Sequence, residues 1–231
     1  MKIHRAEDRG HVNHDWLEAK HSFSFGEYYN PRAMRFGSLR VLNEDLVEPG
    51  QGFGMHPHQD AEILTYVLSG KIKHEDSMGH GGVISHGEIQ YMSAGSGVRH
   101  SEFNASESEA VHLYQIWVLP NEKGLEPRYE QKKFPPEGRL NQWQLIASPL
   151  GENNSFRIAQ DVKFYATELE AEHSLDYELQ SNRQLWLQVA KGSVNICGHE
   201  LRSGDGVSFE KAQEINITAL NNSEILLFNM A

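Results

Sequence analysis

Hydrophobic residues along the chain come in short runs rich in β-branched and aromatic side chains, separated by glycines and polar turns. The clearest runs are RFGSLRVLN, ILTYVLSGKIKH, AVHLYQIWVL, LWLQVAKGSVNIC and EILLFNM. Short runs bounded by glycine are typical of β-strands, because helices need longer patterns with a period of about 3.6 residues. Only DWLEAK and RYEQKKF offer one or two helical turns. The pattern therefore predicts an all-β protein with little helix.

These runs repeat in order along the chain. TYVLSGKI aligns with LQVAKGSV, SHGEI with RSGDGV, and LYQIWV with ILLFNM. The offset is roughly 110 to 120 residues in each pair, which predicts two β-barrels of similar topology in tandem. The charged, proline-rich segment between them places the boundary near Phe134 to Gly138. We therefore expect one domain over residues 1–135 and a second over residues 136–231.

The composition excludes several classes of partner. Lys and Arg number 21 against 32 Asp and Glu, so the formal net charge is −11. Such a field repels phosphate backbones and anionic membrane surfaces, and we expect no nucleic-acid partner. The amino end lacks an apolar signal region, and no run approaches the roughly 20 apolar residues of a membrane span. These features predict a cytoplasmic protein with no membrane partner.

Cysteine usage fits the same location. The only cysteine, Cys197, cannot form a disulfide within the chain, which agrees with a reducing compartment. His199 lies two residues further on. We expect Cys197 to be a packed thiol beside a turn and not one half of a catalytic pair.

Two histidine pairs carry the candidate chemistry. The stretch GFGMHPHQDAE sets His56 and His58 one residue apart, and GVRHSEFN sets His100 and Glu102 at the same spacing. Side chains two residues apart in a strand project to the same side. Antiparallel strands of one barrel can bring the two pairs together. Three imidazoles and one carboxylate then form a mixed nitrogen and oxygen site for a metal ion.

Other residues compete for a place in this site. Glu62 has the same parity as His56 and His58, but it lies about 13 Å from His58 along an extended strand. We therefore prefer Glu102 as the carboxylate ligand and expect Glu62 to accept a hydrogen bond at the edge of the site. His112 alternates with apolar neighbours and is expected to be a hydrogen-bonded core histidine. The remaining histidines are expected to be surface or hydrogen-bonded residues: His4, His11, His14, His21, His74, His80, His86, His173 and His199.

The same residues resemble a known family. GQGFGMHPHQDAEILTYVLSG resembles the first motif of the cupins, and GEIQYMSAGSGVRHSEFN resembles the second. The second motif departs from the pattern, because Ser93 stands where proline is expected and two extra residues precede His100. With these departures, HPH, EILTYVLSG, MSAG, RHSE and HLYQIWV resemble the pirin family specifically. The resemblance covers nearly the whole chain and is strongest from about residue 36 to residue 134.

The pirin resemblance implies a bicupin, with two jelly-roll barrels of which only the first holds a metal ion. The implied ligands are His56, His58, His100 and Glu102. Aligning Gly192 on Gly70 places Glu178 and Gln180 where the histidines of a second site would be. We therefore expect the second barrel to lack metal ligands and to act as a scaffold.

The resemblance also implies an activity, quercetin 2,3-dioxygenase. The expected cofactor is one divalent ion, Fe(II) first, with Mn, Co, Ni, Cu and Zn left open. Four protein ligands leave coordination positions for a flavonol and O₂. Glu102 would be both ligand and the base that takes the flavonol hydroxyl proton, and ring opening would release carbon monoxide. The expected mouth is lined by Phe53, Met55 and Met92.

Two other functions stay open. Pirins include proteins that bind transcription regulators and sense redox state, so a metal-dependent protein-interaction module is the first alternative. A metal-dependent isomerase that needs no oxygen is the second. We expect a monomer in each case. The loop HEDSMGHGGVISHG is a candidate lid, although an exposed hairpin turn is the preferred interpretation.

Overall fold

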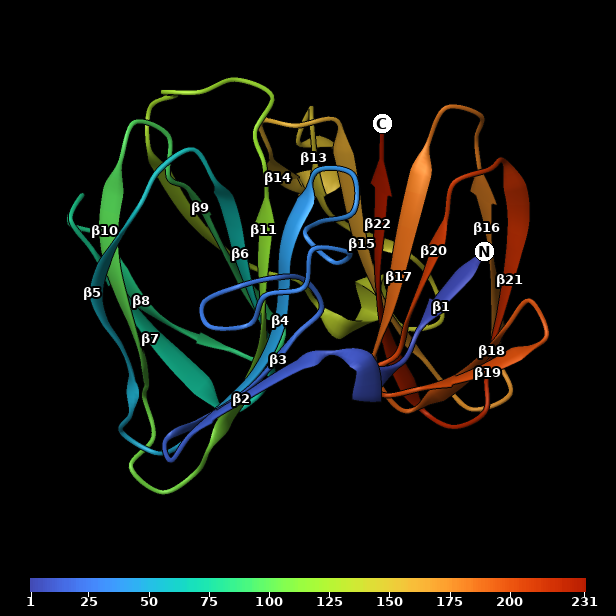
Figure 1. Cartoon of the computed structure of the whole chain (residues 1–231), viewed down its shortest axis with the longest axis horizontal. Helices are drawn as coiled ribbons and strands as arrows, with labels where there is room; N and C mark the ends of the chain where they lie inside the picture. The colour runs from blue at the N-terminus through green and yellow to red at the C-terminus, as the bar shows by residue number, and fades with distance from the viewer. The chain divides into compact units, whose positions relative to one another are not determined.

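The computed structural model describes all 231 residues, and nearly all of its regular structure is β-strand (Figure 1). Helix is limited to three single 3₁₀ turns: η1 (Ala6–Asp8), η2 (Pro136–Gly138) and η3 (Glu152–Asn154). None of these turns has the length or the hydropathy to cross a bilayer. The predicted all-β class with little helix is confirmed.

The chain divides into two compact units, each built from two β-sheets. Residues 9–134 form one unit, here called the first barrel, and residues 1–8 with residues 135–231 form the other, here called the second barrel. The expected range of the first domain began at residue 1. In the structure, β1 (Lys2–His4) instead pairs antiparallel with β20 (Gly206–Phe209). A strand of three residues carries no periodicity that could predict this pairing.

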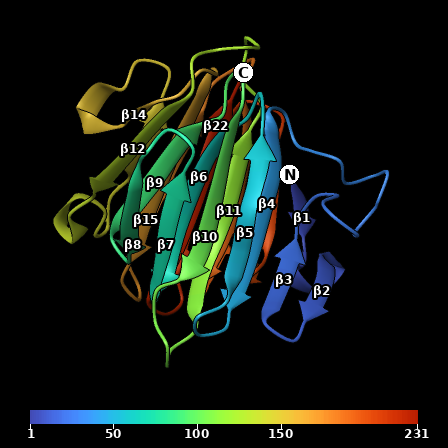
Figure 2. The same cartoon turned by 90° about the vertical axis from the view of Figure 1, so that its left-hand side faces the viewer.

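The first barrel contains a seven-stranded and a four-stranded sheet. In Figure 1 the smaller sheet faces β9, β6, β11 and β4, and Figure 2 shows its strands β8, β7, β10 and β5 side by side. The larger sheet has the order β12 (Arg128–Lys133), β9 (Glu88–Ser93), β6 (Glu62–Ser69), β11 (Val111–Val118), β4 (Leu39–Val47), β3 (Leu17–His21) and β2 (Gly10–His14). The smaller sheet has the order β5 (Gly52–His58), β10 (Val98–Asn104), β7 (Lys71–Asp76) and β8 (Gly81–Ser85).

The second barrel repeats this plan. After β1 and β20, its larger sheet continues through β17 (Gln184–Lys191), β22 (Ser223–Met230), β15 (Val162–Leu169), β13 (Gln144–Ser148) and β14 (Phe156–Arg157). Its smaller sheet has the order β16 (Ser174–Leu179), β21 (Gln213–Ala219), β18 (Ser193–Ile196) and β19 (His199–Arg202). The order β16, β21, β18, β19 therefore corresponds to β5, β10, β7, β8 in the first barrel.

Two equivalent glycines show why the repeat is visible in the sequence. Gly70 joins β6 to β7 with φ of 78°, and Gly192 joins β17 to β18 with φ of 80°. A Cβ atom would lie 2.7 Å from the Ala110 carbonyl oxygen at Gly70 and 2.4 Å from the Asn222 carbonyl oxygen at Gly192. Only glycine fits both the left-handed backbone and the close approach. The predicted tandem repeat of two barrels is confirmed.

Both helical predictions are wrong. DWLEAK runs into β3, which lies between β2 and β4, and RYEQKKF forms β12 at the edge of β9. Leu17 and Ala19 become buried in the sheet. Pairing with neighbouring strands outweighs a weak helical preference, which is worth only tenths of a kcal/mol per residue, roughly.

Two turns test the predictions made for Cys197 and for the candidate lid. Cys197 is exposed, so the prediction of a packed thiol is wrong. It occupies the two-residue turn between β18 and β19 with φ of 51°, followed by Gly198 with φ of 84°, and this backbone is typical of a type I′ hairpin. The segment considered as a lid forms the antiparallel hairpin of β7 and β8, as preferred.

Candidate metal centre

The pairing of β5 with β10 brings three histidines together. His100 lies directly opposite His56, and Val98 lies opposite His58. The ring centroids are 4.5 Å apart for His56 and His100, 4.7 Å for His56 and His58, and 4.8 Å for His58 and His100. One candidate ligand atom from each of the three lies within 4.8 Å of the others. Residues distant in sequence thus form one compact imidazole cluster.

The hydrogen bonds of this cluster leave nitrogen lone pairs free. Nδ1 of His56 lies 2.7 Å from the carbonyl oxygen of Gly54. A carbonyl only accepts, so Nδ1 carries the proton and Nε2 keeps the lone pair. His100 is 1% exposed, and its Nε2 is buried with no hydrogen-bond partner in the protein. Leaving such an atom unpaired costs about 1–3 kcal/mol, which a metal ion bound at this nitrogen would offset.

Burial keeps His58 and His100 neutral. Burial and, to a smaller extent, the nearby histidines lower the pKa of His58 to about 3 and that of His100 to about 3. Neutral imidazole is the form that binds metals, because a protonated ring has no lone pair to donate. At neutral pH these side chains are therefore ready to act as ligands.

Glu102 lies deep inside the barrel. It is 3% exposed, its Oε1 accepts a hydrogen bond from the Thr65 hydroxyl at 2.9 Å, and its Oε2 accepts one from Nε2 of Gln115 at 2.7 Å. Burial raises the pKa of this carboxyl above its usual value. The β10 ladder shifts register between His100 and Glu102. Both carboxylate oxygens are therefore fixed by neighbours, inside an environment that favours a nearby positive charge.

The carboxylate of Glu102 lies close to His74, which is not one of the four predicted ligands. His74, His100 and Glu102 have candidate ligand atoms within 4.8 Å of one another, as do His56, His58 and His100. The four predicted ligands are thus divided between two overlapping groups that share His100, and the second group also contains His74. Glu102 does not fall within that distance of the other two histidines as a single group.

His74 was expected at the surface or in an ordinary hydrogen bond, and it is in fact fully buried. Its Nδ1 lies 3.3 Å from Nδ1 of His100 and 3.1 Å from Nε2 of Gln90. Its ring stacks on Tyr129, with centroids 4.8 Å apart. The parity of His74 with Ile72 in the strand KIKHED was the signal that could have found it.

The competing candidates lie elsewhere. Glu62 accepts hydrogen bonds from the Tyr91 and Ser93 hydroxyls, and it belongs to neither group of candidate ligands. His112 is only partly buried, and its Nε2 lies 3.0 Å from a carboxylate oxygen of Glu44. His112 is thus hydrogen-bonded, as expected, but it is not a core residue.

A cavity of about 170 Å³ adjoins the histidines. Its apolar lining comes from Phe25, Phe53, Ile63 and Trp117, and its further polar lining from Asn43, Asp45 and Gln115. The prediction for Phe53 is confirmed. The predictions for Met55 and Met92 are wrong, because Met55 is exposed and Met92 is fully buried behind the cavity lining, in an apolar cluster with Ile63. Met55 is adjacent to His56 in the strand and therefore projects to the other side.

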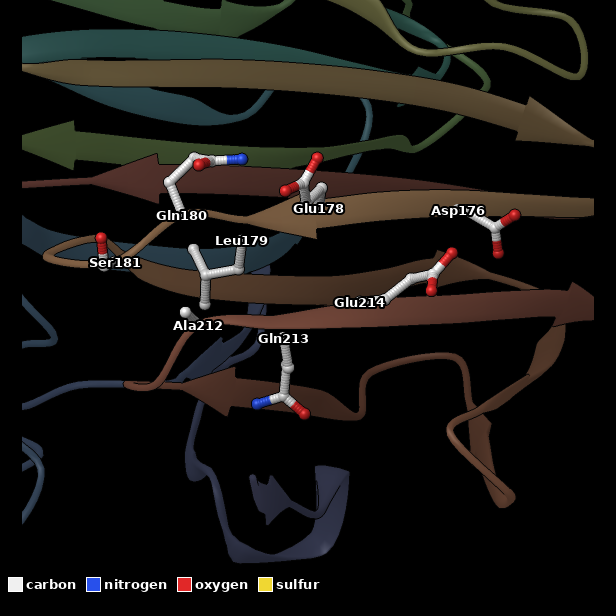
Figure 3. Close-up of a pocket in the computed structure, with 8 residues that line it drawn as sticks. All are labelled: Asp176, Glu178, Leu179, Gln180, Ser181, Ala212, Gln213 and Glu214. Carbon is white, nitrogen blue, oxygen red and sulfur yellow. The ribbon is translucent and has the colours of Figure 1, made fainter.

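The second barrel presents different side chains at the same places. In its smaller sheet, Tyr177 lies opposite Ile215, and both pack into the apolar core. Glu178 and Gln180, aligned with the histidines by sequence, are exposed and line a depression of about 770 Å³ (Figure 3). The alignment is wrong by one residue. Residues 180–183 connect β16 to β17, whereas only residues 59–61 connect β5 to β6, and one extra residue reverses which side chains face inward.

Comparison with known proteins gives matches over both halves of the chain. The family model Pirin matches residues 3–118, and the model described as Quercetinase C-terminal cupin domain matches residues 145–230. A quercetin 2,3-dioxygenase of Escherichia coli strain K12 is 46% identical over 99% of this chain and 97% of its own length. A pirin-like protein of Caulobacter vibrioides is 39% identical over 96% of each chain. Among solved structures, the bacterial pirin YhhW from Escherichia coli in complex with nickel(II) is 45% identical, covers 99% of this chain and 98% of its own, and has a TM-score of 0.94.

Proposed function

Because this chain belongs to the pirin family, we propose that it is a metal-dependent dioxygenase that cleaves a flavonol such as quercetin in the first barrel. The observation that carries the proposal is the cluster of three imidazoles beside a buried carboxylate and a partly apolar cavity. Relatives that cover almost the whole chain are named quercetin 2,3-dioxygenase, which supports the same reaction. The proposed ligands are His56, His58, His100 and Glu102.

The residues present fit a divalent metal ion. Their donors are imidazole nitrogen and carboxylate oxygen without thiolate, a set that suits several first-row metals. Nε2 of His100 and Nε2 of His56 each offer a lone pair that can coordinate a cation. The nickel(II) complex of a related pirin supports one such ion. Fe(II) stays our first expectation for the native ion, as do a cytoplasmic location and a monomeric state.

A bound divalent ion would supply Lewis-acid stabilisation of the anion that forms when a flavonol loses its 3-hydroxyl proton. Glu102 would take that proton at a carboxylate oxygen, because it is the buried carboxylate that lies beside the histidine cluster. Thr65 and Gln115 hold the carboxylate in one orientation during this step. Phe53 and Trp117 offer apolar surface for a flat ring and keep water from that part of the cavity.

Oxygen uptake and carbon monoxide release test this proposal directly. We expect metal-loaded protein in air to consume one O₂ and to release one carbon monoxide for each quercetin that disappears. Protein stripped with a chelator should lose this activity and regain it when the metal is restored. Quercetin turnover that continues without oxygen would contradict the dioxygenase and favour the isomerase. Metal-loaded protein that never consumes quercetin would leave the interaction module as the better explanation.

A further inference from the structure

Two polar side chains on β4, which are distant from the histidines in sequence, enter the cavity. Asn43 and Asp45 alternate with outward-facing residues and therefore project to the same side of the sheet. Each is 3% exposed, and both line the cavity of about 170 Å³. Asn43 lies directly opposite Gln115 on β11, and Gln115 in turn donates to Glu102. A polar strip therefore leads from the proposed base to these two side chains.

Each of these side chains has one oxygen that the protein leaves unpaired. Oδ1 of Asn43 and Oδ1 of Asp45 are buried without any hydrogen-bond partner. Glu44, which lies between them and faces the other way, is bonded to Arg9, His112 and Tyr114. The same strand thus satisfies its carboxylate on one side and leaves two acceptors unpaired on the other. Such acceptors are costly unless a ligand in the cavity donates to them.

The charge around Asp45 agrees with this interpretation. Burial, together with the nearby Glu102, raises the pKa of the Asp45 carboxyl to about 7, although Arg9 acts in the opposite direction. Asp45 therefore lacks a cation close enough to hold its pKa at the ordinary value. A neutral hydroxyl donor suits this position better than a second anion.

The rest of the cavity limits the shape of the ligand. Phe25, Phe53 and Trp117 provide apolar surface around the polar strip. A volume of about 170 Å³ is smaller than the roughly 300–1,000 Å³ typical of sites that enclose a drug-sized molecule. One hydroxylated aromatic ring fits inside, and the remainder of a larger ligand must lie at the mouth.

We propose that Asn43 and Asp45 recognise the ligand by accepting hydrogen bonds from hydroxyl groups on an aromatic ring bound in the cavity. They would act as specificity-determining residues, separate from the metal ligands. The inference rests on the proposed function, because it takes a polyhydroxylated flavonol as the ligand class.

The test is equilibrium binding to metal-loaded protein under nitrogen, with two flavonols as probes. Quercetin carries several ring hydroxyls, whereas 3-hydroxyflavone carries only the hydroxyl that would approach the metal. We expect the wild type to bind quercetin at least tenfold more tightly. In Asn43→Leu and Asp45→Leu, the Kd for quercetin should rise about tenfold each, since one such hydrogen bond is worth about that factor. The Kd for 3-hydroxyflavone should stay within about twofold, since that ligand never makes these bonds.

Controls separate recognition from folding. Asp176→Leu makes a similar change at an exposed position of the second barrel and should alter neither Kd. If Asp45→Leu does not fold, Asp45→Asn keeps the shape and one acceptor, and it should weaken quercetin binding by a smaller factor. Unchanged binding of 3-hydroxyflavone is the internal check that each variant retains its site.

The outcomes distinguish this inference from the proposed function. Equal losses for both flavonols, or no loss of selectivity, would overturn the role of Asn43 and Asp45 even if quercetin is cleaved. A loss of selectivity in the variants, together with no carbon monoxide from the wild type in air, would support recognition and contradict the dioxygenase.

Discussion

The two barrels share one pattern of strand pairing and differ in the side chains that it turns inward. In the first barrel, β5 and β10 direct His56, His58, His100 and Glu102 to the interior side. In the second, β16 and β21 direct Tyr177, Ile215 and Ile217 inward. The backbone plan therefore does not decide whether a site exists. A few inward-facing positions decide it, on a scaffold that serves both purposes.

The difference also has an energetic side. The interior of the first barrel contains buried polar atoms without a protein partner at Asn43, Asp45 and His100. The corresponding interior of the second barrel is a continuous apolar cluster that includes Leu185, Ile215 and Ile217. Apolar burial contributes about 25 cal/mol per Å², whereas unpaired polar atoms oppose folding. The first barrel therefore gives up apolar burial where it gains a site, whereas the corresponding interior of the second barrel keeps it.

Removing one imidazole should have the largest effect, because it should take the metal site away from the first barrel. In His56→Ala, we expect bound metal to fall from about one ion per chain to almost none, because the cluster loses one of its three nitrogen donors. Turnover of quercetin should fall to the level of chelator-treated protein. Elemental analysis and carbon monoxide release measure both. His199→Ala, an exposed histidine of the second barrel, is the matched control and should change neither. Full metal content in His56→Ala would contradict the proposed ligand set.

The equivalent change in the second barrel should affect stability instead. Ile215 is fully buried and lies opposite Tyr177. Ile215→Ala should lower the free energy of unfolding by about 2–5 kcal/mol, and Ile215→Val by about 0.5–1.5 kcal/mol. Urea titration measures the loss, and metal content should stay at the wild-type level. Loss of metal without loss of stability would mean that the second barrel contributes to the site.

Much of this contrast could be predicted from the sequence. Glycines at Gly70 and Gly192 mark equivalent hairpins, because no other residue fits their backbone, and they reveal the repeat. The spacing of His56 with His58, and of His100 with Glu102, fixes shared sides by strand geometry alone. These features depend only on neighbouring residues, so glycine conformation and strand geometry predict them without knowledge of the fold.

The site predictions fail where residues far apart in sequence meet in the fold, or where one extra residue changes which side of a strand a residue faces. Glu178 was aligned with a ligand position, but the longer connection before β17 shifts the strand by one residue and turns Glu178 outward. Asn43, Asp45 and His74 have no motif, and only the pairing of β4 with β11 and of β7 with β10 brings them to the cavity or to His100. Such residues become visible when inward parity is checked along every strand of the barrel.

His74 gives a third and smaller test of the contrast. Its buried ring lies beside His100 and stacks on Tyr129, so it holds His100 in place. Residues that orient a ligand contribute about 10–100-fold to metal affinity. We expect His74→Ala to weaken metal binding by that factor while about one ion still binds at saturation, as measured by competition with a chromophoric chelator.

His21 provides the control for this test, because it is a buried histidine that packs against Phe25 and Tyr28. His21→Ala should leave metal affinity within about twofold of the wild type, since His21 has no contact with a proposed ligand. A complete loss of metal in His74→Ala would instead make His74 a ligand. An unchanged affinity would remove it from the site.

The smallest expected effect is the acid sensitivity of the metal-free first barrel. Burial holds the pKa of His58 at about 3, against an ordinary value of 6.5 in the unfolded chain. Between these values the unfolded chain binds more protons than the folded one, so stability is fully present above pH 6.5 and falls as the pH drops toward 3. Asp45, whose pKa burial raises to about 7, acts in the opposite direction, because its contribution is lost as the pH rises through 7.

A comparison with His58→Gln isolates the histidine, because the substitution removes one of these proton-binding groups and leaves Asp45 in place. In urea titrations of chelator-treated protein between pH 7.5 and 4, the wild type should take up about one proton more on unfolding than His58→Gln once the pH is well below 6.5. Parallel stability curves for the two proteins would mean that His58 is not held neutral by burial, and the contrast between a strained polar interior and a relaxed apolar one would lose its clearest thermodynamic sign.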